Sequence, residues 1–157
     1  MFVSVSAFVG SPGWNELNDA SRTLLQSLNL VFNSTFIPQH PVLDVTNVND
    51  VFFCDEAHGT LYNNYPLLTP ALRNTTLALT VQFLQIYNTF PYAVKRILAG
   101  RLVSEILNSM DAVITNASVL RLLHYSAHDS TVQPLLMALE VFDGTPVPYA
   151  SDHSLLI

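Results

Sequence analysis

The sequence predicts an α/β fold in which a long, mainly helical part precedes a short strand–helix–strand part. Over most of residues 1–117 the apolar side chains recur at spacings of three and four, which is typical of amphipathic helices. Near residue 119 this pattern gives way to a continuous apolar run, which indicates a strand buried on both faces of a parallel sheet. We therefore divide the chain into a helical segment, residues 1–117, and a sheet-forming segment, residues 118–157.

The first helix is expected to begin at Ser11 and Pro12, because serine caps helices and proline suits the first helical position. It should end before Pro38. Two prolines and many polar residues over residues 33–50 predict a loop. A short helix or turn is expected to follow over residues 48–54.

Residues 55–66 have no clear pattern and are expected to be irregular. The pair Thr69-Pro70 repeats the cap-and-proline signature and predicts a helix that runs toward Pro91. The third helix has the clearest apolar stripe. Its members are Val94, Ile97, Leu98, Leu102, Ile106, Met110 and Val113.

The C-terminal segment should begin with a buried strand over residues 119–125. A helix is expected over residues 130–142, with the Asp-Gly pair at residues 143–144 as its stop. Residues 153–157 are apolar enough to begin a second strand.

The composition is more apolar than that of a typical soluble surface, with 50% hydrophobic residues, 11% charged residues and a mean hydropathy of +0.34. A membrane protein and a part of a larger soluble fold are the two explanations. The longest uncharged stretches, residues 23–43 and 74–94, are interrupted by Asn, Gln, Thr and Pro, so neither reads as a transmembrane helix. We favour a part of a larger fold whose remainder covers the excess apolar surface.

Charge and cysteine content exclude several classes of function. The formal charge of −6 and a single lysine, Lys95, argue against nucleic-acid binding, which needs a basic stripe. The single cysteine, Cys54, excludes an internal disulfide framework and a zinc site built from several cysteines.

Three Asn-x-Ser/Thr sequons, at Asn33, Asn74 and Asn116, are candidate glycosylation sites and fit passage through the secretory pathway, although a chain rich in these residues also produces sequons by chance. Residues 1–10 are apolar but lack a positively charged start, so they make a poor signal peptide. If the protein is secreted, we expect the export signal outside this chain.

The junction between the predicted strand and the following helix carries a His128-Asp129 pair. Ligands of open α/β sheets bind beyond the carboxyl ends of strands, and the start of a helix attracts anions such as phosphate. A protonated His128 would donate a hydrogen bond to a phosphoryl oxygen, and Asp129 would give a proton to a leaving alkoxide. The alternative is structural: Asp129 as a helix cap and His128 as a buried, hydrogen-bonded histidine.

This region resembles the histidine acid phosphatases, the prostatic and lysosomal type of the histidine phosphatase superfamily. The resemblance is carried by the runs Tyr125-Ser126-Ala127-His128-Asp129-Ser130-Thr131-Val132, Met137-Ala138-Leu139 and Pro148-Tyr149-Ala150-Ser151. Weaker similarity extends back through residues 102–108 and 53–58 to about Trp14.

The resemblance implies a phosphoglycerate-mutase-like α/β core with a mainly helical cap, and hydrolysis of phosphate monoesters through a phosphohistidine. It implies no metal and no organic cofactor. Matched by position, His128 is the second histidine of the phosphate pocket and contacts the phosphoryl group, and Asp129 is the proton donor to the leaving group.

The chain departs from the family pattern in its nucleophile. The family's reacting histidine lies in an Arg-His-Gly motif, which is absent from these 157 residues. The other histidines, His40, His58, His124 and His153, lack the arginine neighbours of such a site, so we interpret them as structural. The five arginines lie in or beside predicted helices and the last strand. They are Arg22, Arg73, Arg96, Arg101 and Arg121.

A second departure concerns a disulfide. The family counterpart of Cys54 usually pairs with a cysteine at the position that Asp152 occupies here. The resemblance therefore implies that a disulfide worth about 2–4 kcal/mol is missing, as in a divergent or degraded gene.

We interpret the chain as a fragment of a histidine acid phosphatase that is inactive alone and acts on no nucleic acid. The expected location is the secretory pathway, extracellular or lysosomal, and the apolar surface would allow a homodimer. One alternative is a secreted, non-catalytic pseudo-phosphatase or binding protein. Another is a metal-dependent His-Asp phosphohydrolase, which needs further ligands on helices and is disfavoured because His128 ends a predicted strand.

Overall fold

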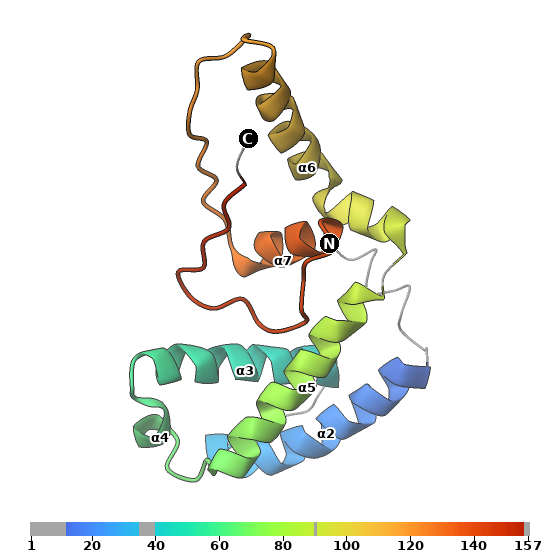
Figure 1. Ribbon diagram of the computed structural model, residues 1–157. Coiled ribbons are helices and arrows are strands. Elements are labelled where there is room, and N and C mark those ends of the chain that lie inside the picture. The colour runs from blue at the N-terminus through green and yellow to red at the C-terminus, as the bar shows by residue number, and fades with distance from the viewer. Residues whose placement is uncertain (1–11, 35–39, 90, 156–157) are drawn as a thin grey trace. The chain divides into compact units, whose positions relative to one another are not determined.

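The structure is a computed structural model that describes residues 12–34, 40–89 and 91–155. Residues 1–10, interpreted above as a poor signal peptide, lie outside these ranges. The regular structure of the described residues is helical throughout (Figure 1). Its helices are α2 (Pro12–Phe32), α3 (Pro41–Ala57), α4 (Leu61–Asn64), α5 (Pro70–Asn88), α6 (Tyr92–Ile114) and α7 (Asp129–Ala138). The chain divides into two compact units, Met1–Leu84 and Gln85–Ile157.

Helix α2 confirms the prediction of a helix that begins at Pro12 and ends before Pro38. Helix α3 is a correction, because it spans most of the predicted loop as well as the short predicted helix. Its first residue is Pro41, where a missing N–H breaks no helical hydrogen bond. The carboxylate of Asp44 accepts a hydrogen bond from the backbone N–H of His40, 3.3 Å away, and supports the start of the helix. The proline that suggested a loop therefore starts a helix.

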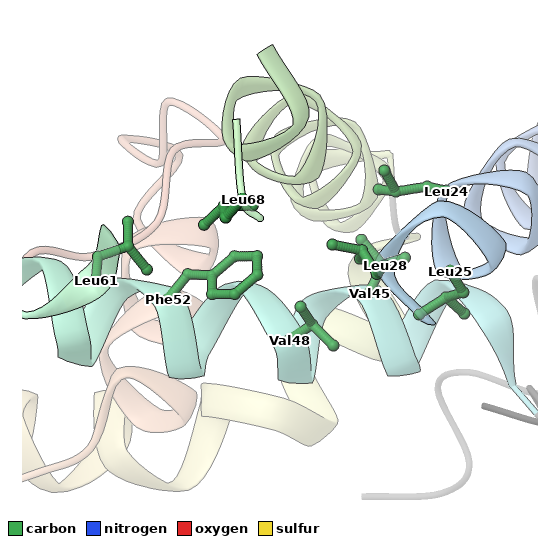
Figure 2. Close-up of a cluster of buried hydrophobic side chains, with 8 residues drawn as sticks. All are labelled: Leu24, Leu25, Leu28, Val45, Val48, Phe52, Leu61 and Leu68. Carbon is green, nitrogen blue, oxygen red and sulfur yellow. The ribbon is translucent and has the colours of Figure 1, made fainter. Parts of the chain in front are cut away.

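The first unit has a hydrophobic core between α2, α3, α4 and the segment that leads from α4 to α5. Figure 2 shows this cluster, in which Val45, Val48 and Phe52 lie along one side of α3. The side chain of Phe52 is 0% exposed. Its ring stacks on Phe32 with centroids 5.6 Å apart and meets the ring of Tyr65 edge-on at 5.3 Å. The remaining members are Leu24, Leu25, Leu28, Leu61 and Leu68.

Helix α5 confirms the Thr69-Pro70 prediction, but its most deeply buried positions are polar. Arg73, Thr76 and Thr80 are at most 5% exposed. The threonine hydroxyls donate to backbone carbonyls one turn earlier: Thr76 to Leu72, 2.9 Å, and Thr80 to Thr76, 3.0 Å. Because the two threonine hydroxyls are hydrogen-bonded, burying them costs little.

The guanidinium of Arg73 joins α5 to α3. Its Nη1 donates to Oδ1 of the buried Asn49, 2.9 Å, and its Nη2 donates to Oε2 of Glu56, 2.8 Å. Glu56 remains half exposed, so the arginine is held by one buried amide and one solvated carboxylate. Arg73 is therefore a structural residue of the first unit.

Replacing Arg73 by alanine is expected to lower the free energy of unfolding by about 1–3 kcal/mol or more. The substitution leaves the buried Oδ1 of Asn49 without its donor and opens a cavity where the arginine stem lay. Urea unfolding followed by circular dichroism measures the change. The matched control is Arg22→Ala, because Arg22 is exposed on α2. Equal midpoints for the two variants would contradict a structural role.

The second unit has fewer buried hydrophobic side chains. Helix α6 confirms the predicted third helix and packs against α7. The buried hydrophobic residues of the described part of this unit are Ala99, Met137 and Phe142. Several large apolar side chains are exposed, with Val119 at 95% and Leu122 at 81%. None of the helices in the described ranges is long and apolar enough to cross a membrane.

The two predicted strands are not formed in the described part of the chain. Residues 119–125 are extended but unpaired, and residues 153–155 are likewise irregular. A strand is defined by hydrogen bonds to a neighbouring strand, and these residues have no such neighbour in the described ranges. The α/β core that the apolar run predicts is thus not seen here, and the fold observed is helical.

Helix α7 starts one residue before the predicted position and ends four residues early, at Ala138. Glu140 adopts a left-handed conformation with φ of 59°, which stops the helix before the Asp-Gly pair. Asp143 forms a separate turn, in which its Oδ1 accepts hydrogen bonds from the hydroxyl and the N–H of Thr145 at 2.7 and 2.8 Å. These bonds lower the pKa of Asp143.

Candidate active site

The His128-Asp129 pair lies where an extended segment, residues 118–128, leads into α7 (Figure 1). His128 is the N-cap residue, with extended backbone angles of φ −82° and ψ 163°. Asp129 is the first residue of the helix. The structure therefore places both residues at a helix start, although the segment before them is not a strand.

The backbone of His128 closes the first turn of α7. Its carbonyl oxygen accepts hydrogen bonds from the N–H groups of Thr131, 2.9 Å, and Val132, 3.0 Å. The imidazole makes no capping hydrogen bond and is exposed. The ring is thus available for an external ligand, and the structural interpretation of a buried histidine is wrong.

The carboxylate of Asp129 is also exposed and is held on one side only. Its Oδ1 accepts a hydrogen bond from the backbone N–H of Ser130, 2.6 Å. Its Oδ2 makes no hydrogen bond to the described residues. Asp129 is not the N-cap residue, because His128 occupies that position. The Oδ2 atom of Asp129 is therefore available to a ligand.

Three features of this helix start suit a phosphoryl group. The first-turn N–H groups carry a partial positive charge, the exposed imidazole is a hydrogen-bond donor, and the exposed carboxyl group is a proton carrier. The two residues are consecutive, so the donor and the proton carrier both belong to the start of the same helix. This arrangement can bind an oxyanion and protonate its leaving group, but it contains no nucleophile.

Among the described residues, no hydrogen bond or ion pair joins an arginine to this helix start. Arg73 is committed to Asn49 and Glu56 in the first unit. In the second unit, Arg96, Arg101 and Arg121 are exposed. Arg101 lines a separate open groove of about 490 Å³, which sequence patterns did not reveal. It is lined by Arg101, Ser104, Glu105, Asn108, Ser109, Ala112, Ser118, Leu120 and Leu123.

Most of the groove residues that belong to α6 are polar positions of the kind that any amphipathic helix exposes, so they gave no signal in the sequence. The others, Ser118, Leu120 and Leu123, come from the segment after α6, and their approach to the helix is a tertiary effect. Neither His128 nor Asp129 lines the groove. The groove and the helix start are therefore two separate features of the second unit.

The remaining histidines are placed as follows. His58 caps α3, with its Nδ1 2.8 Å from the carbonyl oxygen of Cys54, which agrees with the structural interpretation. His40 is the N-cap of the same helix. His124 and His153 are exposed, and their structural roles stay predictions. The described residues contain no group of histidine, cysteine or carboxylate side chains that could hold a metal ion.

A family model and several curated relatives indicate the same family for this chain. A family model for the histidine phosphatase superfamily, branch 2, matches residues 14–154. Lysosomal acid phosphatase of Homo sapiens is 33% identical over 138 residues, which cover 87% of this chain and 32% of that protein. The Xenopus laevis lysosomal enzyme is 36% identical over 144 residues, covering 88% and 32%. Prostatic acid phosphatase of Homo sapiens is 36% identical over 113 residues, covering 69% and 28%.

The chain spans about a third of the length of the curated relatives it matches. No solved structure matches it. The family match covers both units and includes the start of α7. The chain belongs to branch 2 of the histidine phosphatase superfamily.

Proposed function

We propose that this chain supplies the proton donor and the second phosphate-binding histidine of an acid phosphatase that hydrolyses phosphate monoesters. The observation that carries the proposal is the exposed His128-Asp129 pair at the start of α7, within the region matched by the family. Relatives named lysosomal and prostatic acid phosphatases support this class of reaction. The names of the lysosomal relatives also support a location in the secretory pathway.

In the proposed reaction, a nucleophilic histidine attacks the phosphorus atom and the bond to the leaving oxygen breaks. The imidazolium of His128 donates a hydrogen bond to a phosphoryl oxygen and offsets its negative charge. Asp129 transfers its proton to the leaving alkoxide. Water then attacks the phosphohistidine, its proton passes to Asp129, and phosphate leaves. The pair thus acts in both steps without a metal or an organic cofactor.

The nucleophile is the missing component. No Arg-His-Gly sequence occurs in these 157 residues, and none of the four other histidines lies in such a motif. We propose that the nucleophile and the arginines of the phosphate pocket must come from polypeptide outside residues 1–157.

We also propose that the chain forms part of an α/β core. We assign residues 1–117 to the cap and the helices that flank the core, and residues 118–157 to a strand–helix–strand part of the core. The exposure of Val119 and Leu122 in an extended segment supports this assignment, since both are apolar side chains that a sheet would bury. Strand pairing by the rest of the core would satisfy the free backbone groups of this segment.

The chain alone is expected to show no turnover of p-nitrophenyl phosphate above the buffer rate at acidic pH. Without a nucleophile there is no phosphohistidine, and the proton donor has no leaving group to serve. Release of p-nitrophenol by purified chain measures the rate.

His128→Ala is the control for that assay, because it distinguishes turnover at this site from a contaminating phosphatase. Acid-range turnover by the chain that His128→Ala abolishes would overturn the proposal that the chain is inactive alone. Turnover that both proteins share at equal level would come from a contaminant.

A second candidate is a secreted pseudo-phosphatase or binding protein that never has a nucleophile. The absence of an Arg-His-Gly sequence favours this candidate as much as it favours an incomplete enzyme. The transcript upstream of Met1 discriminates between them. An in-frame Arg-His-Gly segment supports the enzyme, whereas a start at Met1 or a directly preceding secretion signal supports the pseudo-enzyme.

A further inference from the structure

We propose that Asn116 is an acceptor site for an N-linked oligosaccharide. Asn116 begins the sequon Asn116-Ala117-Ser118, directly after the end of α6. The proposal goes beyond the phosphatase reaction and does not rest on it.

Backbone hydrogen bonds around Asn116 already satisfy carbonyl groups at the end of α6. Asn116 adopts a left-handed conformation, with φ of 56°, immediately after the C-cap residue Thr115. Its N–H donates to the carbonyl of Val113, 3.1 Å, and the N–H of Ser118 donates to the carbonyl of Ala112, 2.9 Å. These backbone bonds close the last turn of α6, and the hydroxyl of Thr115 adds a hydrogen bond to the carbonyl of Asp111, 2.8 Å. The carboxamide of Asn116 is therefore not needed to end the helix.

The carboxamide is also accessible. Asn116 and Ala117 are exposed, and Ser118 is half-buried. The Asn116 side chain makes no hydrogen bond to the described residues, so its Nδ2 is available for a new covalent bond. A bulky, hydrophilic substituent at this position would extend into solvent.

The other two sequons lack this combination. Asn74 lies inside α5, and the third residue of its sequon, Thr76, is 0% exposed with its hydroxyl bonded to the carbonyl of Leu72. Asn33 shares the left-handed backbone, but its sequon ends at Thr35, outside the described residues. The structure thus describes one sequon whose three residues all reach the surface.

Asparagine is favoured in a left-handed turn for conformational reasons alone, so Asn116 by itself does not argue for a glycan. The surface beside it does. Ile114, the last residue of α6, lies two residues before Asn116 and is 64% exposed. A glycan at Asn116 would hydrate this apolar end of α6, which otherwise promotes association.

The modification uses an oligosaccharide carried on a lipid pyrophosphate as co-substrate, as supplied by a transferase of the secretory pathway. The Nδ2 of Asn116 forms a bond to the anomeric carbon of the sugar, and the bond between that carbon and the pyrophosphate oxygen breaks. The lipid pyrophosphate leaves with the bonding electron pair. The amide nitrogen loses one proton to a base of the transferase.

The test is site occupancy in the full chain, residues 1–157, expressed behind a cleavable secretion signal and fused to a tag that carries a sequon of known high occupancy. Trypsin cuts after Arg101 and Arg121, so residues 102–121 are released as a peptide that contains the Asn116 sequon and no other. Enzymatic deglycosylation in heavy-oxygen water converts each modified asparagine to a labelled aspartate. Mass spectrometry then gives the modified fraction.

We expect most copies of this peptide to be labelled in the wild-type chain and in Ser118→Thr, which keeps the sequon. Ser118→Ala, which keeps Asn116 but removes the sequon, should lose at least tenfold in occupancy. An unlabelled peptide in the wild-type chain and in Ser118→Thr, from protein whose tag is labelled, would overturn the proposal. So would equal labelling of Ser118→Thr and Ser118→Ala.

Discussion

Replacing Asp129 by asparagine is expected to lower kcat by about 10²–10⁴-fold in an enzyme that contains this helix start and a nucleophile. Asparagine keeps the shape of the side chain but has no acidic proton to give to the leaving alkoxide. The measurement uses human lysosomal acid phosphatase with its matched segment replaced by residues 122–142 of this chain. The loss should be larger for an alkyl phosphate than for p-nitrophenyl phosphate, because p-nitrophenolate leaves without protonation more easily.

Glu140→Gln in the same chimera is the matched control, since Glu140 is an exposed carboxylate of the same segment beyond the end of α7. Its kcat should equal that of the parent chimera. A chimera that folds but is inactive before substitution, or equal losses for Asp129→Asn and Glu140→Gln, would contradict the role of Asp129. Dependence of the loss on the leaving group separates proton donation from a purely structural effect.

Replacing Phe52 by alanine is expected to lower the free energy of unfolding by about 3–5 kcal/mol. The ring is 0% exposed and contacts the rings of Phe32 and Tyr65, so its removal loses both buried apolar area and two aromatic contacts. Domains of this size are stable by about 5–15 kcal/mol, so this single change consumes a large part of the total. Urea unfolding monitored by circular dichroism gives the change.

Val51→Ala is the matched control for Phe52→Ala, because Val51 is the adjacent residue of α3 and is 44% exposed. It should change the stability much less. Similar losses for the two variants would show that the cluster around Phe52 is not the core of the first unit.

Local signals in the sequence located three helices well. Proline at the first position marked α2 and α5, and the regular apolar stripe marked α6. The same signal was misinterpreted at Pro41, because the many polar residues around it favoured a loop. Helix α3 forms there because Val45, Val48 and Phe52 lie on one side and are buried together by α2 and by residues 61–68. This burial is a tertiary effect that local composition does not contain.

The buried face of α5 shows a second limit. Apolar periodicity assigns the interior to leucines such as Leu72, Leu77 and Leu79, yet Arg73 and Thr76 are more buried than these. The hydroxyls are satisfied within the helix, and the guanidinium finds its partners on α3, 17 and 24 residues away in the sequence. A pattern that counts apolar residues cannot detect partners supplied from such a distance.

The sequence by itself determined the family, through a short run around His128 and Asp129, and the identity of the two residues that we propose for phosphate binding and proton transfer. It also determined where most helices begin, because capping and the fixed φ of proline are local properties. Only the tertiary structure decided which residues are buried, what Arg73 binds and that residues 119–125 remain unpaired. A strand exists only where a second strand satisfies its backbone, and the described residues provide none.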